Sequence, residues 1–333
     1  MAMKDYSGIW VYAEQRDGKL DGVVPELLTK ARELAAYTRE ELTAVLPGFQ
    51  VQELAAELIA CGADRVILAE SENLAVYSVR PYQQAIAQLA EKYRPSIILY
   101  GATCQGRELA PRVMVSLDTG LTADAMDLGF DEDGVFYQTT PAYGGSIYAD
   151  IVIPRRRPQM ATVRPGMFCP AQPDYSRRGE TICERLEVRE DEDFALVSEA
   201  PKSTGTVPLD KAAVIVAGGR GVKTGKELDM LRELAELLDG RVAGSRPLVD
   251  SGLLPHACQI GQSGATVKPE LLINVAVSGS VQYQVGMKGA KRIISINLNK
   301  NAPIFDISQY GAVANFREVL PALIDEIKRR RAR

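Results

Sequence analysis

The sequence predicts an α/β protein of two domains, each built on a parallel sheet. Its 333 residues exceed the roughly 150 that one domain commonly needs, so two hydrophobic cores are expected. Short apolar runs alternate with longer amphipathic stretches in both halves, and this order of strands and helices is typical of parallel sheets. Hydrophobic residues make up 46% and charged residues 25% of the chain, a composition that favours a globular protein over a disordered or fibrous one.

In the first half, three apolar runs predict strands and three stretches with helical periodicity predict helices. The expected strands are Ile9–Ala13, Arg65–Ala69 and Ser96–Tyr100, and the expected helices are Pro25–Tyr37, Gln52–Ala60 and Tyr82–Tyr93. Because strands and helices alternate here, we expect the strands to form a parallel sheet.

From about residue 123 to residue 163 the helical pattern stops and short β-type runs follow one another. These runs, Val135–Thr140, Ile147–Ile153 and Met160–Val163, predict an antiparallel extension at the end of the first domain. Arg155–Arg157 stand directly before Pro158. This basic triplet is either a solvated loop or a docking surface for a partner or an anionic cofactor.

Between residues 178 and 211, a run of acidic side chains leads into a tail that contains Pro, Ser, Thr and Gly. This composition is typical of a linker. We therefore expect residues 1–195 to form the N-terminal domain, residues 196–208 a linker and residues 209–333 the C-terminal domain.

The second domain opens with the β-type run Ala212–Ala217, which leads into a glycine-rich loop. Thr224 and Glu227 have the spacing of a capping box, so a helix is expected to start there. One face of that helix is apolar and consists of Leu228, Leu231, Leu234 and Leu238.

Two further strands and a last helix are expected toward the C-terminus. The strands are Leu271–Val277 and Arg292–Asn297, and the helix begins after Asn315, with Glu318 at the capping-box spacing. The helix runs toward the basic residues Lys328–Arg331, whose positive charge suits the negative end of a helix dipole.

The charge balance and the apolar runs exclude several classes of protein. The chain has 39 Lys and Arg against 43 Asp and Glu, a net charge of −4 that does not suit a protein that binds phosphate backbones. Lys4, Asp5 and Glu14 interrupt the start of the chain, and no apolar run approaches ~18 residues. We expect no nucleic-acid partner, no membrane insertion and a cytoplasmic location.

The cysteines and the single histidine supply little side-chain chemistry. The five cysteines never form Cys-x-x-Cys and their number is odd, which argues against a metal site, an iron–sulfur cluster and a disulfide framework. His256 stands alone and is interpreted as a structural residue. Reduced thiols and no bound metal are therefore expected.

Polar, glycine-rich loops follow the β-type runs of the second domain. The first, Gly218–Gly221, lies between a strand and a helix but matches neither the dinucleotide fingerprint nor a P-loop, so nucleotide binding and a plain tight turn both remain open. Similar loops are Gly244–Arg246, Gln259–Gly264 and Ser278–Ser280. Such loops converge at the carboxyl ends of parallel strands, and Arg220 and Arg246 add positive charge there. The pattern favours a pocket for a long anionic ligand such as a dinucleotide.

At these residues the chain resembles the electron-transfer flavoprotein alpha subunit. The matching blocks of the second domain are Gly218–Gly221, Ser245-Arg246 with Val249-Asp250, Gln259–Gly264, Ser278–Gln282, Gly286–Lys288, and Ile296-Asn297 with Ala302–Phe305. The blocks of the first half are Gly120–Asp124 and Arg157–Gly166. The similarity therefore spans nearly the whole chain.

The resemblance implies a nucleotide-hydrolase-like N-terminal domain that forms the subunit interface, and a Rossmann-like C-terminal domain that binds FAD. It implies a heterodimer with a beta subunit that shuttles electrons to or from an acyl-CoA dehydrogenase-type flavoprotein. By position, the residues that contact FAD would be Arg220, Ser245, Arg246, Gln259, Ile260, Gly261, Gln262, Ser263, Ser278, Gly279, Ser280, Val281, Gln282, Tyr283, Asn297 and Asn315.

Physical roles follow for some of these residues. Arg246 would lie over the isoalloxazine and favour its anionic forms, because an adjacent cation stabilises negative charge. Ser263 could hydrogen-bond flavin N5, Gln262 a ring oxygen, and the Ser278-Gly279 loop the pyrophosphate. Tyr283 stands where the family often has a histidine near flavin O2, and Asn315 where an aspartate is frequent at the adenosine end. These two departures concern the groups that would set the flavin potential and contact the ribose.

Two other classes of function remain as alternatives. One is a stand-alone NAD-dependent oxidoreductase, against which the broken glycine fingerprint argues. The other is a non-redox nucleotide-binding module. Within the family, a simple carrier would have AMP in the beta subunit. A bifurcating form would use NADH, have a second FAD there, and pass electrons to ferredoxin or flavodoxin as well. The Gly8–Glu14 and Arg157–Gly166 segments favour the bifurcating form by analogy with anaerobe sequences.

Overall fold

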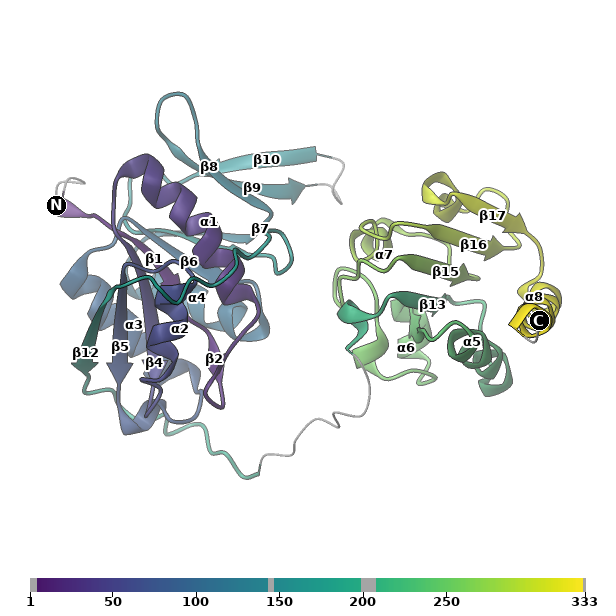
Figure 1. Ribbon diagram of the computed structural model, residues 1–333, viewed down its shortest axis with the longest axis horizontal. Helices are drawn as coiled ribbons and strands as arrows, with labels where there is room; N and C mark the ends of the chain where they lie inside the picture. The colour runs from purple at the N-terminus through teal and green to yellow at the C-terminus, as the bar shows by residue number, and fades with distance from the viewer. Residues whose placement is uncertain (1–4, 143–146, 199–207, 332–333) are drawn as a thin grey trace. The chain divides into compact units, whose positions relative to one another are not determined.

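The computed structural model describes residues 5–142, 147–198 and 208–331. The chain divides into two compact units, Met1–Ser198 and Glu199–Arg333, each with its own sheet and its own core (Figure 1). Most of the expected linker, residues 199–207, lies outside the described residues.

The first unit is built on a seven-stranded sheet in the order β12-β5-β4-β1-β6-β11-β7, and every pair in it is parallel. Its strands are β1 (Ile9–Tyr12), β4 (Leu42–Gly48), β5 (Arg65–Glu70), β6 (Ile97–Gly101), β7 (Gly120–Ala125), β11 (Gln159–Val163) and β12 (Glu180–Arg185). The central strands β1, β4 and β6 are buried along their whole length and largely apolar, because helices cover both faces of the sheet.

In the described part of the first unit, two helices pack on each face of this sheet. The helices α1 (Val23–Thr38) and α2 (Leu54–Ala60) contribute to one buried cluster, and α3 (Val79–Tyr93) and α4 (Cys104–Ser116) contribute to the other. Neither β4 nor α4 stands out in the sequence. β4 ends in Pro47-Gly48, which resembles a turn, and α4 contains Gly106 and Pro111, both poor helix formers.

A small sheet in the order β10-β9-β8 extends the first unit. Its antiparallel strands are β8 (Asp127–Phe130), β9 (Phe136–Ala142) and β10 (Ile147–Val152), which confirms the predicted extension for the first two β-type runs. The prediction is wrong for Met160–Val163. This run belongs to β11, which is buried along its whole length between β6 and β7 and pairs parallel with both.

The acidic stretch after residue 178 also begins with a strand that the sequence analysis did not recognise. β12 pairs in parallel with β5 at the edge of the large sheet. Its charged residues have partners on this edge, since Glu180 accepts from Arg65 Nε at 2.8 Å and Glu184 pairs with Lys92 at 2.6 Å. Charged side chains are common on edge strands, which is why this strand resembles part of a linker in sequence. A short ribbon of β2 (Gln15–Arg16) and β3 (Lys19–Leu20) completes the unit.

The second unit has a five-stranded, fully parallel sheet in the order β14-β13-β15-β16-β17. The strands are β13 (Val214–Gly218), β14 (Arg241–Gly244), β15 (Leu271–Val275), β16 (Ile293–Asn297) and β17 (Tyr310–Val313), and the helices are α5 (Gly225–Leu237), α6 (Arg246–Asp250), α7 (Val281–Val285) and α8 (Phe316–Arg331). In chain order the strands run 2-1-3-4-5, a doubly wound arrangement with a reversal between β13 and β15.

Different elements cover the two faces of the second sheet. α5 and α8 form a buried cluster with one face, whereas α7 and the turn Pro303–Ile307 pack on the other (Figure 1). The predicted capping box is confirmed at α5, where Thr224 and Glu227 hydrogen-bond each other's backbone. Lys328–Arg331 lie in the last turn of α8, as expected.

Candidate cofactor-binding site

The predicted FAD-contacting residues gather at one edge of the second sheet, where its parallel strands end. Arg220 follows β13, Ser245 and Arg246 follow β14, Ser278–Ser280 follow β15, and Asn297 ends β16. The strand order reverses between β13 and β15, so the loops after these two strands leave the sheet in opposite directions. In open α/β sheets, ligands bind in the crevice that this divergence creates.

Close backbone contact at the reversal explains the glycines of the first loop. The Gly219 amide donates to Val275 O at 2.9 Å, and a Cβ at Gly219 would lie only 2.0 Å from Ala276 O. A Cβ at Gly221 would lie 2.6 Å from Ala276 Cβ. These glycines are therefore required by packing between the two loops, whether or not a phosphate binds them.

The loop Gln259–Gly264 is tied to the end of β14 at one side and to α7 at the other. The Ile260 amide donates to Gly244 O at 2.9 Å, and the Gln262 amide donates to Gln282 O at 2.8 Å. Gln259 is buried and donates through Nε2 to Ser263 Oγ at 2.9 Å. Gly261 adopts a φ of 136°, a conformation open to glycine. Gln262 and Ser263 are therefore exposed on a loop whose backbone is fixed by hydrogen bonds to its neighbours.

The loop Ser278–Gln282 is anchored in a similar way. Gly279 has a φ of 80°, and a Cβ there would lie 2.5 Å from the Ile304 nitrogen. The Ile304 amide donates to Ser278 O at 3.0 Å, and Gln284 Nε2 donates to Gly279 O at 2.8 Å. Ser278, Ser280, Val281 and Gln282 remain exposed.

The Tyr283 side chain does not face the candidate site, where the family resemblance implies that it would contact flavin O2. Its side chain is 3% exposed, and its hydroxyl donates to Asn274 Oδ1 at 2.6 Å inside the core. Burial raises the pKa of this phenol above its usual range, so it stays protonated as a donor. The expectation that the phenol faces flavin O2 is therefore corrected, because in this fold the hydroxyl already has a partner in the core.

The two asparagines at this edge have structural partners. Asn297 donates through Nδ2 to Val277 O at 2.8 Å and accepts from the Asn299 amide at 2.9 Å. Asn315 accepts from the Arg317 amide at 3.2 Å, which caps the start of α8. Both amides fix the turns that they belong to.

Positive charge and apolar surface complete the edge. Arg220 is exposed, and Arg246 is 70% exposed in its side chain, with Nε 3.5 Å from Asp250 Oδ2. Two apolar side chains that the sequence analysis missed, Leu298 and Val313, are 66% and 59% exposed directly after β16 and at the end of β17. The sequence could have indicated both residues, because each is an apolar residue at the end of a strand, where the neighbouring loops have polar residues.

This set of groups fits a long anionic cofactor with a flat ring system. Backbone amides and exposed Ser and Gln side chains supply donors, the two arginines supply charge, and the exposed apolar residues supply surface for a ring. The second unit is thus a doubly wound domain of the class that binds nucleotide cofactors at a strand-order reversal.

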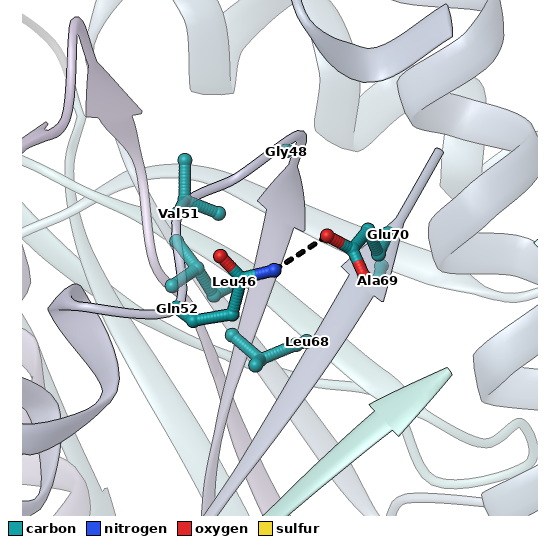
Figure 2. A pocket seen from close by; sticks show the side chains of 7 residues that line it. All are labelled: Leu46, Gly48, Val51, Gln52, Leu68, Ala69 and Glu70. Carbon is teal, nitrogen blue, oxygen red and sulfur yellow. Dashed lines mark hydrogen bonds between the residues drawn. The ribbon is translucent and has the colours of Figure 1, made fainter. Parts of the chain in front are cut away.

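The strand order of the first unit reverses between β1 and β6, and the Glu14 side chain lies at this reversal. Glu14, which follows β1, is 8% exposed, and its Oε2 accepts from Thr103 Oγ1 at 2.5 Å. A shallow surface hollow lies farther along the same edge, at the ends of β4 and β5 (Figure 2). It is lined by Leu46, Gly48, Val51, Gln52, Leu68, Ala69 and Glu70. It contains no enclosed space for even a water molecule, so it does not form a small-molecule pocket.

We expect Glu14→Gln to remove a pH dependence of stability. Burial raises the pKa of Glu14 from 4.5 to about 7, with the Thr103 hydrogen bond opposing part of this shift. Between these two values the folded chain binds more protons than the unfolded chain, so stability falls as the pH rises from 5 to 7, by at most about 3 kcal/mol. Urea unfolding at pH 5, 6 and 7 should show a flatter profile in Glu14→Gln. The exposed Glu132→Gln serves as control, and an unchanged profile in Glu14→Gln would contradict the assignment.

Comparison with known proteins agrees with this architecture. The family model described as the electron transfer flavoprotein domain matches residues 9–187, and the electron transfer flavoprotein FAD-binding domain matches residues 208–288. The chain is 43% identical over 328 residues to the electron transfer flavoprotein subunit alpha of Thermoanaerobacterium thermosaccharolyticum, covering 98% of this chain and 99% of the relative. It is 42% identical to the corresponding subunit of Megasphaera elsdenii, covering 99% of each chain.

A third relative has a more specific name. The lactate dehydrogenase (NAD(+),ferredoxin) subunit LctC of Acetobacterium woodii is 40% identical, and the match covers 97% of this chain and 77% of the relative. The chain belongs to the electron transfer flavoprotein family as an alpha subunit, and its second unit is the FAD-binding domain of that family. Among the described residues, no helix combines the length and the apolar character that crossing a membrane requires.

Proposed function

We propose that this chain holds FAD at the carboxyl edge of its second sheet and, paired with a beta subunit, passes electrons to or from an acyl-CoA dehydrogenase-type flavoprotein. One observation supports this above others. The donor-bearing loops Gln259–Gly264 and Ser278–Gln282 are joined by the hydrogen bond from the Gln262 amide to Gln282 O, at the carboxyl edge of a domain that matches the FAD-binding family model.

FAD supplies the electron chemistry when it is bound, and the chain's own residues bind and orient it. Ser278 and the Gly279 amide would hold the pyrophosphate, with Arg220 as a nearby cation. Gln262 and Ser263 are exposed residues, and the Gln262 amide and the Ser263 hydroxyl, which accepts from Gln259, would donate to the ring edge. Arg246 would bring a fixed positive charge to the ring, since a guanidinium stays protonated at physiological pH. Tyr283 is not assigned a contact with the ring.

We place the interface with the beta subunit on the first unit, at its antiparallel extension. The edge strand β10 exposes apolar residues on both of its faces, with Ile147 at 55%, Tyr148 at 59% and Val152 at 43%. An uncovered apolar edge strand is a ready site for a partner. In the purified complex, hydrogen exchange of the β10 amides should be slowed relative to the isolated chain, and equal rates would argue for another interface.

We further propose that the complex bifurcates electrons from NADH, with a second FAD in the beta subunit and ferredoxin or flavodoxin as a second acceptor. The relatives support this, because one is named an NAD- and ferredoxin-dependent lactate dehydrogenase subunit. Another, 34% identical, is the acryloyl-CoA reductase electron transfer subunit beta of Anaerotignum propionicum. A cytoplasmic location is part of the same proposal, since ferredoxin and NADH are intracellular reactants.

Counting the cofactors of the purified heterodimer tests this proposal. Two FAD per complex are expected if the complex bifurcates. One FAD with one AMP would instead identify a simple carrier, and a complex without flavin would overturn the electron-transfer proposal as a whole.

A further inference from the structure

Tyr283 belongs to a buried chain of hydrogen bonds that none of the roles assigned above uses. Its hydroxyl donates to Asn274 Oδ1 at 2.6 Å, and Asn274 Nδ2 donates to Ser295 Oγ at 3.2 Å. Ser295 Oγ lies 2.7 Å from Ser308 Oγ, which donates to Ile304 O at 2.7 Å. Tyr283, Asn274 and Ser295 are at most 3% exposed. The chain of bonds therefore runs from α7 across β15 and β16 to the turn Pro303–Ile307.

Both loops with proposed FAD contacts are attached to the ends of this row of hydrogen bonds. At α7, Gln282 O accepts from the Gln262 amide, and Gln284 Nε2 donates to Gly279 O, each at 2.8 Å. At the far end, the Ile304 amide donates to Ser278 O at 3.0 Å. Because α7 has only five residues, its position depends on contacts outside the helix.

The Tyr283 hydroxyl joins α7 to strand β15 of the sheet beneath it, through Asn274. Asn274 Oδ1 is fully buried, so no water can replace the phenol if it moves away. A buried network with every member paired holds one arrangement of its side chains. Displacing the phenol would leave a buried acceptor unpaired and would free α7 to shift, together with the loops attached to it.

We propose that Tyr283 is a positioning residue for FAD, which acts through Asn274 to hold the Gln259–Gly264 and Ser278–Gln282 loops in the geometry that binds the cofactor. The proposal rests on the proposed FAD-binding function of this unit. It assigns the phenol no contact with the ring. Loops that are held before binding lose less freedom on binding, which strengthens affinity.

The test is a double-mutant cycle on the full chain purified with its beta subunit. The FAD dissociation constant is measured for wild type, Tyr283→Phe, Asn274→Leu and the double variant. Each single substitution should weaken FAD binding about tenfold, or about 1.4 kcal/mol, and the double variant should be no weaker than the weaker single variant. Ser295→Ala, which removes the next link, should weaken binding about threefold and provides a second variant if Asn274→Leu does not fold.

A matched control separates positioning from loss of stability. Tyr82 is 2% exposed in the first unit, and its hydroxyl donates to Leu74 O at 2.9 Å. Tyr82→Phe should lower the unfolding temperature in a similar way to Tyr283→Phe and leave the FAD dissociation constant unchanged. A parallel loss of FAD affinity in Tyr82→Phe would overturn the positioning role.

Three further results would also overturn it. Wild-type affinity in Tyr283→Phe would show that the phenol does not affect the loops. Wild-type affinity in Asn274→Leu together with weak binding in Tyr283→Phe would show a direct contact between phenol and cofactor. Additive effects in the double variant would show that the two side chains act separately. A wild-type complex that binds no FAD would instead contradict the proposed function.

Discussion

Gly219→Ala is expected to abolish FAD retention and to destabilise the second unit by several kcal/mol. The added Cβ would lie 2.0 Å from Ala276 O and 2.6 Å from the Ala276 carbonyl carbon, so backbone rather than a flexible side chain has to move. That movement separates the loops after β13 and β15, where the Gly219 amide now donates to Val275 O. Forced overpacking against a backbone commonly costs more than the roughly 1–3 kcal/mol of a side-chain clash, and we expect about 3–5 kcal/mol.

Gly225→Ala is the matched control for this substitution. Gly225 is the first residue of α5, and a Cβ there would have no atom within 4 Å. Alanine at a compatible position is expected to be neutral or to stabilise by about 0.4–1 kcal/mol. FAD content after gel filtration and chemical unfolding of both variants provide the comparison. A Gly219→Ala protein with wild-type FAD content would show that the reversal between β13 and β15 is not part of the binding site.

Arg246→Ala is expected to retain FAD and to lower the reduction potential of the flavin. The loops with proposed pyrophosphate contacts remain in this variant, whereas a fixed positive charge is lost next to a ring that gains negative charge on reduction. If the lost interaction is about 1–3 kcal/mol, the one-electron potential should fall by about 40–130 mV. Potentiometric titration of the complex measures this shift. Arg246 has room to turn toward a ligand, because its side chain is 70% exposed and its contact with Asp250 is long.

Two controls accompany this measurement. Arg246→Lys keeps the charge but not the planar fork, so its potential should lie between those of the wild type and the alanine variant. Arg232 on α5 also pairs with an aspartate of its own helix, Asp229 at 2.8 Å, and is 50% exposed. Arg232→Ala should leave the potential unchanged. An unchanged potential in Arg246→Ala would place the guanidinium away from the cofactor.

The candidate site was largely predictable because its signals are local. A polar loop that follows an apolar run identifies the carboxyl end of a strand, and parallel strands bring such ends to one edge. The loops at Gly218, Gly244, Gln259 and Ser278 are therefore placed together by the pattern alone, and the structure brings all four to the edge of the second sheet. The direction in which an individual side chain points within such a loop has no comparable local signal.

Tyr283 illustrates this limit. Its place beside Ser278–Gln282 is fixed by the sequence, but the orientation of its phenol depends on Asn274 and Ser295, which lie on two neighbouring strands. A polar residue inside an otherwise apolar strand, such as Asn274, is the one available hint that a buried donor is required. The identity of that donor follows only from the packing of α7 on the sheet.

The sequence by itself determined the class of the fold, the two sheets of parallel strands and the edge at which the binding loops gather, because apolar runs, helical periodicity and glycine-rich loops act over a few residues. Only the tertiary structure decided that Met160–Val163 enters the large parallel sheet, that Glu180–Arg185 forms its edge and that Tyr283 turns into the core. In each of these cases the deciding partner is remote in the sequence or on another element. Its contribution is a hydrogen bond or a buried surface that exists only once the chain has folded.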